Sequence, residues 1–336
     1  MAVRWQLPSD ELPGPSAKAR ITGLALGLTV RPFTSNLPPY GPGVWVGRTW
    51  VAGMMAAGGS VVRGTRVERV DERTPSGDRA VGEWVRARKA DAFGPVVLYL
   101  HGSGFVICST KTHRSLVSRL SERTGMPVFS SDYRLAPRHR FPAAADDVRA
   151  AWDFLLASGL TADQIVVAGD SAGGHLAVDL TLQLRREAAP TPAAIALFSP
   201  LIDATLALGA ERDKQHRDPL ISAAGARRLV SRYTAGVDPT HPRLALPLKD
   251  AHGFPPILIQ AGGSEMFAAD AEYLHRELTA VGARSTLQIW PGQAHVFQAF
   301  PRLTREADPA LDQAAQFLAA NVTSRQNKSL NKQVAG

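Results

Sequence analysis

The stretch from Gln164 to Leu176 constrains the fold of this chain more than any other. The run Gln164 to Ala168 is apolar and predicts a buried strand. Gly169, Ser171 and Gly173 follow in a Gly-x-Ser-x-Gly pattern, and a leucine-rich helical segment comes next. A strand, a sharp turn and a helix form a nucleophile elbow, in which a serine hydroxyl is lifted above a sheet. The pattern alone also fits a plain Gly-Ser turn, so the rest of the chain has to distinguish the two.

Composition narrows the class of protein. The chain has 336 residues, of which 45% are hydrophobic and 20% charged, as in an ordinary globular protein. This length suits one large α/β domain with an insertion, or two small domains. Cys108 is the only cysteine, which excludes an internal disulfide and a cysteine-rich metal site. We therefore predict no metal centre.

The net charge and the apolar segments indicate whether the chain binds nucleic acid or inserts into a membrane. The formal net charge is +8, but no arginine-rich run alternates with aromatic residues, so we predict no nucleic-acid partner. No apolar run reaches membrane-spanning length. Acidic residues and prolines precede the apolar run Ile21 to Val30, where an export signal would begin with basic residues. We therefore expect a helix packed on the domain, no stable membrane insertion and a cytoplasmic location.

Strand patterns alternate with helical patterns along most of the chain. Two alternating segments, 65–72 and 81–87, flank a Pro-Ser-Gly-Asp turn and predict a hairpin. From residue 95 onward, apolar strands and helical segments succeed one another, which predicts a mostly parallel α/β sheet with helices on both faces. The strands are expected at 95–100, 127–131, 164–168, 193–201, 256–261 and 285–290. Functional side chains in such sheets follow the carboxyl ends of strands.

Histidine candidates for a catalytic base differ in their place along the chain. A serine nucleophile needs an adjacent base, and the base needs an orienting acid. His295 follows the last predicted strand, so the order serine, acid, histidine matches α/β-hydrolases. His101 precedes the serine, and His175 lies on the helix after it, where its side chain would point away from the Ser171 hydroxyl. His295 is therefore the predicted base.

The acid is expected just past the strand at 256–261. Glu265 and Asp270 both follow that strand. Asp270 lies about a turn or more further on, and a charge at a helix N-terminus is the better interpretation of it. Glu265 is therefore the predicted acid, with Asp270 as the alternative.

Acyl transfer also needs preorganised N–H donors for the oxyanion. One donor should be the backbone N–H of Ala172, directly after the serine. The others should come from the loop His101-Gly102-Ser103-Gly104, whose glycines let N–H groups face a substrate. A phosphate-binding loop is a weak alternative, because neither Gly-Lys-Ser/Thr nor the Rossmann glycine spacing is present.

Four blocks of sequence together resemble the hormone-sensitive lipase-like (bacterial family IV) carboxylesterases of the α/β-hydrolase superfamily. The blocks are His101-Gly-Ser-Gly-Phe105, Asp132-Tyr-Arg-Leu-Ala-Pro137 with Phe141-Pro-Ala-Ala144, Gly169-Asp170-Ser171-Ala-Gly173-Gly174, and the pair 263–270 and 292–297. They cover about residues 65 to 320 in the family's order. The resemblance implies roles in ester hydrolysis for the nucleophile Ser171, the base His295, the acid Glu265 and the oxyanion donors Ser103, Gly104 and Ala172.

The resemblance also implies a helical cap over an α/β-hydrolase domain. The N-terminal segment 1–60 and an insertion at about 204–246 would form the cap, and 61–322 the domain. The polar tail 323–336 is expected to be disordered. The candidate pocket walls are the large apolar residues Trp5, Trp45, Trp50, Met54 and Met55.

The expected activity is hydrolysis of carboxylic esters with short to medium acyl chains, through an acyl-enzyme and without a cofactor. A lactone hydrolase, an arylformamidase or another amidase would use the same residues. A non-catalytic receptor on this fold is disfavoured because His295 is present. The expected partner is a small-molecule ester, and a homodimer is left open. Ser103 stands where the family has a second glycine, which leaves open whether its side chain takes part.

Overall fold

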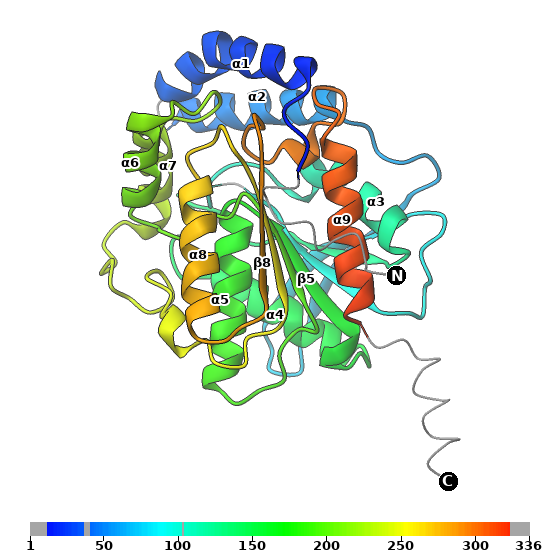
Figure 1. Ribbon diagram of the computed structural model, residues 1–336. Helices are drawn as coiled ribbons and strands as arrows, with labels where there is room; N and C mark the ends of the chain where they lie inside the picture. Colours follow the sequence, from blue (N-terminus) through cyan, green and yellow to red (C-terminus); the bar gives the residue numbers. More distant parts are fainter. Residues whose placement is uncertain (1–11, 37–40, 103, 323–336) are drawn as a thin grey trace.

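A single sheet with helices on both faces forms the body of the molecule (Figure 1). The structure is a computed structural model that describes residues 12–36, 41–102 and 104–322. Within these ranges, eight strands pair in the order β1-β2-β4-β3-β5-β6-β7-β8. All neighbours from β4 to β8 run parallel, whereas β2 pairs antiparallel with both β1 and β4, so the predicted mostly parallel sheet is confirmed. The strands are β1 (Arg66–Arg73), β2 (Arg79–Arg86), β3 (Val96–Leu100), β4 (Val128–Ser131), β5 (Ile165–Asp170), β6 (Ile195–Phe198), β7 (Ile257–Gly262) and β8 (Ser285–Trp290).

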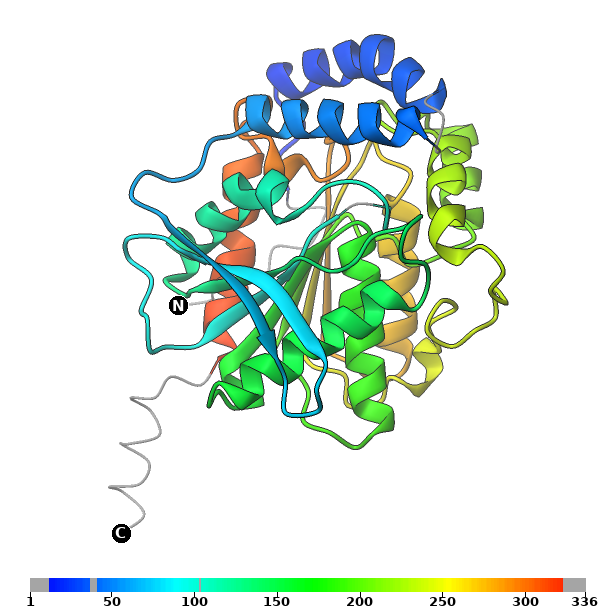
Figure 2. The same cartoon turned by 180° about the vertical axis from the view of Figure 1, so that it is seen from behind.

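Central and edge strands differ in burial because only the central ones are covered on both faces. Every residue of β3, β5, β6 and β7 is buried, as expected for parallel strands between two helical layers. β1 lies at the edge of the sheet and is exposed at every position except Val70. Its charged side chains disfavour pairing with another chain. The predicted hairpin is formed by β1 and β2 and crosses the view in Figure 2.

Helices cover both faces of the sheet and bury two separate cores. One face carries α4 (Ala143–Ala157), α5 (Ala172–Arg186) and α8 (Ala268–Ala280), and the other carries α3 (Thr110–Thr124) and α9 (Ala307–Ala320). Alternate residues of one strand enter different cores, because successive side chains point to opposite faces. Leu98 and Leu100 of β3 belong to the first core, and Val97 and Tyr99 to the second. Short 3-10 helices are η3 (Ala162–Gln164), η4 (Leu248–Asp250) and η5 (Phe297–Ala299).

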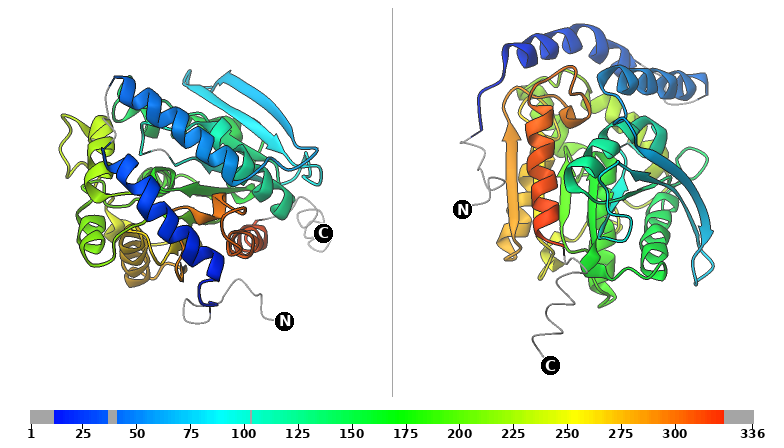
Figure 3. Two further views of the ribbon diagram at one scale, coloured as in Figure 1. Left: turned by 90° about the horizontal axis from the view of Figure 1, so that it is seen from above. Right: turned by 90° about the vertical axis from the view of Figure 1, so that its right-hand side faces the viewer.

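Four further helices, which we call the cap, come from two distant parts of the chain. They are α1 (Ala17–Asn36), α2 (Pro42–Gly58), α6 (Ala207–Gln215) and α7 (Ala223–Thr234). Seen from above, α1 and α2 cross the top of the molecule (Figure 3, left). Arg31 of α1 forms a 2.9 Å ion pair with Asp213 of α6, and each side chain is only 11% exposed. This pair joins the two parts of the cap.

The outer face of α1 is apolar and exposed. Ile21, Leu24 and Leu28 lie on one side of the helix and are 68%, 70% and 79% exposed. Ala19 and Val30 are buried on its inner side. The helix expected at this position therefore packs on the molecule by one face only. None of the helices in the described part of the chain is sufficiently long and apolar to cross a bilayer.

Candidate active site

Ser171 stands at the turn between β5 and α5, as the elbow pattern predicts. Its φ of 50° and ψ of −120° place it in a region that residues with a Cβ rarely occupy. The start of α5 approaches the neighbouring strand β3 so closely that a Cβ on Gly173 would lie 1.9 Å from the Leu100 carbonyl oxygen. Only glycine fits there, which gives the Gly-x-Ser-x-Gly spacing its physical reason. The side chain of Ser171 lines a cavity beneath the cap.

Glu265 and His295 are in direct contact. The Nδ1 atom of His295 lies 2.5 Å from Oε2 of Glu265. Glu265 follows β7 and is fully buried, and His295 lies in the loop after β8 and is 6% exposed. The two loops are neighbours because β7 and β8 pair in parallel. His295 also lines the same cavity as Ser171, so the structure brings the predicted nucleophile and the predicted base to one space.

The second carboxylate oxygen of Glu265 receives two donors. The Gly262 N–H donates to Oε1 at 2.5 Å, and the Ser199 hydroxyl donates to it at 2.6 Å. Ser199 directly follows β6, and sequence reasoning missed it. The only signal was its position after the carboxyl end of a predicted strand, which it shares with the residues that were singled out.

The pKa of His295 is raised above its ordinary value. Burial lowers this pKa, but the charge of Glu265 and its hydrogen bond raise it by more, with smaller contributions from the charges of Asp218 and Asp170. The carboxylate therefore stabilises the imidazolium form. This is the electrostatic arrangement that a general base needs in order to keep a proton during a reaction.

Asp270, the alternative acid, has a different place. Its Oδ1 atom accepts the backbone N–H groups of Ile202 and Asp203, each at 2.8 Å. Burial raises the pKa of Asp270 to about 7, although these hydrogen bonds oppose the shift. Asp270 lies in the first turn of α8 and ties the chain after β6 to that helix. The structure therefore favours Glu265 over Asp270 as the partner of His295.

The two other candidate histidines, His101 and His175, make contacts that hold the fold together and do not pair with a carboxylate next to Ser171. The His101 ring stacks on Tyr133 with centroids 4.3 Å apart, and burial together with the neighbouring His113 lowers the pKa of His101 to about 4. The Nε2 atom of His175 lies 3.0 Å from the Arg243 carbonyl oxygen, away from the elbow. Among the described residues, His295 and His113 are the histidines that line the cavity.

The loop predicted to supply oxyanion donors lies beside the elbow. Ser103 falls outside the described residues, and Gly102 and Gly104 on either side of it line the cavity. Gly104 has a φ of 54°, and a Cβ there would lie 2.6 Å from the Leu229 side chain of α7. Ala172 is the first residue of α5, where a backbone N–H has no partner within the helix.

Asp170, the residue before the predicted nucleophile, is buried and binds side chains from β3 and α3. The Tyr99 hydroxyl donates to Oδ1 of Asp170 at 2.7 Å, and Nε2 of His113 lies 3.4 Å from Oδ2. Burial raises the pKa of Asp170, but the charge of His113 and these hydrogen bonds lower it by more, so that the net shift is downward. Asp170 is therefore held as a buried carboxylate against Gly102 of the 101–104 loop.

The cavity is an apolar space of about 190 Å³ between the cap and the carboxyl ends of the strands. Trp50, Met54 and Met55 line it as predicted. Trp45 does not, because it lies on the outer face of α2 and is 68% exposed, so this prediction is wrong. Trp5 falls outside the described residues. Helices α2 and α7 of the cap supply part of the apolar walls, and the loops at the carboxyl ends of the strands supply the rest.

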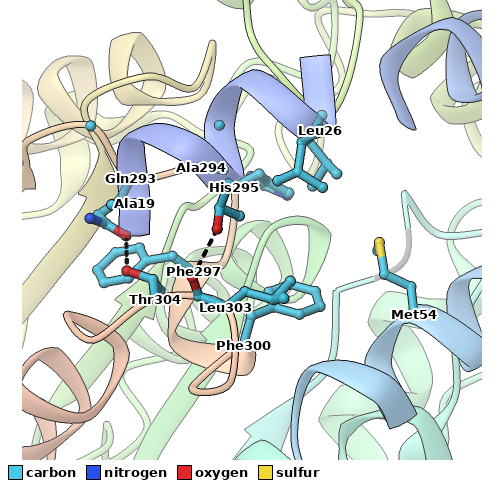
Figure 4. A pocket seen from close by; sticks show the side chains of 14 residues that line it. Ala19, Leu26, Met54, Gln293, Ala294, His295, Phe297, Phe300, Leu303 and Thr304 are labelled. Atoms are coloured by element: carbon cyan, nitrogen blue, oxygen red, sulfur yellow. Dashed lines mark hydrogen bonds between the residues drawn. The ribbon is translucent and has the colours of Figure 1, made fainter. Parts of the chain in front are cut away.

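A smaller pocket adjoins His295 on the side of α1. It has a volume of about 30 Å³, and Figure 4 shows Leu26, Met54 and Phe300 around it. The Thr304 hydroxyl donates to the Gln293 side chain at 2.7 Å and closes one wall. Across the described ranges, no group of three or more His, Cys, Asp or Glu side chains is placed to hold a metal ion.

The chain is similar to known proteins in sequence and in fold. A family model described as the alpha/beta hydrolase fold matches residues 97–299. The carboxylesterase/phospholipase LipF of Mycobacterium tuberculosis is 36% identical over 91% of this chain and 82% of its own length. A crystal structure of an esterase from the bacterial hormone-sensitive lipase family has a TM-score of 0.81 and 31% identity, over 93% of this chain and 100% of that one. The esterase EstE5, soaked by p-nitrophenyl butyrate, has a TM-score of 0.79 and 31% identity, over 91% and 99%.

The family model and the relatives match the part of the chain that carries the candidate site. The serine elbow after β5 and the contact of Glu265 with His295 occupy the carboxyl ends of parallel strands. The matches extend over the sheet and the cap, because the relatives cover nine tenths of the chain. The chain therefore belongs to the hormone-sensitive lipase-like carboxylesterases of the α/β-hydrolase fold family, and it is a carboxylic ester hydrolase.

Proposed function

We propose that the enzyme cleaves short- to medium-chain esters through an acyl-enzyme on Ser171, with His295 as base and Glu265 as acid. One observation carries the proposal. Ser171 and His295 line one apolar cavity, and Glu265 contacts His295 from behind it. A nucleophile, a base and a buried orienting acid are the groups that nucleophilic acyl transfer uses, together with donors for the oxyanion.

In the first half of the reaction, the Ser171 Oγ attacks the ester carbonyl carbon while Nε2 of His295 takes the hydroxyl proton. Glu265 accepts the Nδ1–H of His295 and stabilises the imidazolium. The carbonyl oxygen becomes an oxyanion and accepts the N–H groups of Ser103, Gly104 and Ala172. The C–O bond to the alcohol then breaks, His295 protonates the leaving alkoxide, and the acyl group stays on Ser171.

The second half repeats these steps with water. His295 takes a proton from a water molecule, whose oxygen attacks the acyl carbonyl carbon. The bond to the Ser171 oxygen breaks, His295 returns the proton to that oxygen, and the carboxylic acid leaves. A fluorophosphonate probe tests the proposal, because it labels only an activated serine. Labelling that disappears in Ser171→Ala supports it, and labelling that persists there would contradict it.

The size of the cavity supports a preference for small acyl groups. A space of about 190 Å³ with apolar walls accommodates a butanoyl group, whereas a palmitoyl chain would have to extend beyond it. We expect kcat/KM for p-nitrophenyl butanoate to exceed that for the palmitate ester by about tenfold or more, because the longer chain gains no matching contacts. Steady-state assays on a series of acyl lengths measure this. A preference for emulsified long-chain triglyceride would contradict the prediction, and lactones and formamides in the same panel test the related activities.

Ser103 gives a prediction about the oxyanion donors. If its backbone N–H is the working group, Ser103→Gly keeps the donor and activity stays within about tenfold. If its hydroxyl is the donor, Ser103→Gly and Ser103→Ala should both lose about a hundredfold in kcat. Measuring kcat of both variants on one short-chain ester separates the two. We expect the first outcome, because the N–H position is the one that the family resemblance assigns.

The cytoplasmic location stays a prediction. The formation of a homodimer stays open, as it was from the sequence. A small-molecule ester is likewise the expected partner. The apolar cavity next to Ser171 supports that prediction, because it offers an ester apolar walls beside the candidate nucleophile.

A further inference from the structure

Ser199 occupies an unusual position at the carboxyl end of β6. It is fully buried and has a φ of 50°, a region that favours glycine. Its backbone N–H donates to the Gln260 carbonyl oxygen at 2.6 Å, which fixes it to β7. Glycine would fit this backbone with less strain. The presence of a side chain at this point therefore has to be explained by what its hydroxyl contacts.

The hydroxyl of Ser199 connects the two loops that carry Glu265 and His295. Its Oγ donates to Oε1 of Glu265 at 2.6 Å and accepts the backbone N–H of Val296 at 2.9 Å. Val296 directly follows His295 in the chain. One hydroxyl thus holds both the carboxylate and the backbone next to the imidazole.

We propose that Ser199 is a positioning residue for the catalytic pair, acting through Glu265. The inference rests on the proposed roles of Glu265 and His295. The carboxylate must present Oε2 to the imidazole, because Nδ1 of His295 contacts that oxygen. Ser199 and the Gly262 N–H together occupy Oε1, so the carboxyl group cannot turn without losing two hydrogen bonds.

A hydroxyl suits this position because it donates and accepts at the same time. The N–H of Val296 occupies a lone pair of Ser199, and the hydroxyl proton is directed to Glu265. Hydrogen bonds to a charged group are stronger than those between neutral groups. Their geometry matters most when the imidazolium forms, since the Glu265 carboxylate must then face it. Loss of Ser199 should therefore lower kcat more than it changes KM.

The first experiment compares Ser199→Gly and Ser199→Ala with the wild type. Both remove the hydroxyl, and glycine also relieves the backbone strain at φ 50°. We expect kcat on a short-chain ester to fall about ten- to a hundredfold in both, with KM changed less than about threefold. The glycine variant should melt at a higher temperature than the alanine variant. Wild-type kcat in the folded glycine variant would overturn the proposal.

Ser121→Ala is the matched control. Ser121 is also buried, accepts the Ala87 N–H at 3.0 Å and donates to the Met126 carbonyl oxygen at 2.8 Å, and it lies in the last turns of α3 outside the cavity lining. Its loss removes a comparable pair of hydrogen bonds without touching Glu265. We expect a lower melting temperature but a kcat within about twofold of the wild type. An equal fall of kcat in this control would mean that lost stability explains the Ser199 variants.

A double-mutant cycle decides whether Ser199 acts through Glu265. In a Glu265→Gln background, Ser199→Gly should lower kcat by no more than about threefold further, because the group that it positions is already lost. Losses that multiply would overturn the positioning role while leaving Glu265 as the acid. Wild-type kcat in Glu265→Gln alone would instead contradict the proposed role of Glu265, and the inference with it.

Discussion

Ser171→Ala is expected to lower kcat by about a millionfold, to a small residual rate. The variant has no oxygen that can form an acyl-enzyme, whereas the cavity and the oxyanion donors stay in place. Alanine can occupy the same backbone position, because serine already holds φ at 50° there. Steady-state kinetics on p-nitrophenyl butanoate, with single-turnover measurements to detect any acyl-enzyme, check the expectation.

Ser171→Gly is its control. It removes the hydroxyl too, and it relieves the strain of a residue with a Cβ at positive φ. We expect it to be as inactive as the alanine variant and to melt at a higher temperature. Near-normal turnover in either folded variant would exclude Ser171 as the nucleophile.

Glu265→Gln is expected to lower kcat by about a thousand- to ten-thousandfold. The amide nitrogen of glutamine can donate to Nδ1 of His295, which leaves the ring proton on Nε2, where the Ser171 proton has to go. The neutral side chain also no longer stabilises the imidazolium. Both effects arise because Glu265 contacts His295 at 2.5 Å inside a buried pair.

The wild type and Glu265→Gln should differ in how kcat/KM depends on pH, and the direction of the difference can be predicted. His295 must be neutral to act as a base, so kcat/KM of the wild type falls as pH decreases through the raised pKa of His295. In Glu265→Gln the carboxylate that raises the pKa of His295 is lost, whereas burial of the imidazole still lowers that pKa. The acidic limb of kcat/KM should therefore move to lower pH. An unmoved limb, or one at higher pH, would contradict Glu265 as the partner.

Asp270→Asn serves as the control for Glu265→Gln. Asparagine keeps an acceptor oxygen for the N–H groups of Ile202 and Asp203, and the pKa of Asp270 is already raised to about 7 by burial. We expect its kcat to stay within about threefold of the wild type. A larger loss in Asp270→Asn than in Glu265→Gln would transfer the role of the acid to Asp270.

The sequence predicted those parts of the site that follow from local pattern and chain order. Gly-x-Ser-x-Gly after an apolar run places Ser171 at an elbow, since the helix can approach the neighbouring strand β3 closely only with glycine at 173. The sheet type followed from the alternation of strands and helices, and it places the residues after β7 and β8 next to each other. Glu265 and His295 meet for that reason.

Other features depend on where individual side chains point in the folded protein, which the local sequence pattern does not show. Ser199 contacts Glu265 across two loops, and a serine after a strand does not reveal that its hydroxyl turns toward a carboxylate 66 residues away in sequence. Trp45 was expected to line the pocket because it is large and apolar. Its place on α2 instead turns it outward, while Trp50 and Met54 of the same helix line the cavity.

The contact between Arg31 and Asp213 bears on how this family can recombine. The cap consists of two pieces of chain, 182 residues apart at this ion pair, and each partner is mostly buried. Suppose that recombination replaced the first sixty residues with those of a relative that has no cationic side chain at the position of Arg31. The Asp213 carboxylate would then be left mostly buried without its ionic partner, at a considerable cost in folding free energy. Exchange of gene segments between this chain and a relative should therefore preserve the folded cap best when both pieces are exchanged together, or when the relative carries the same charge pair.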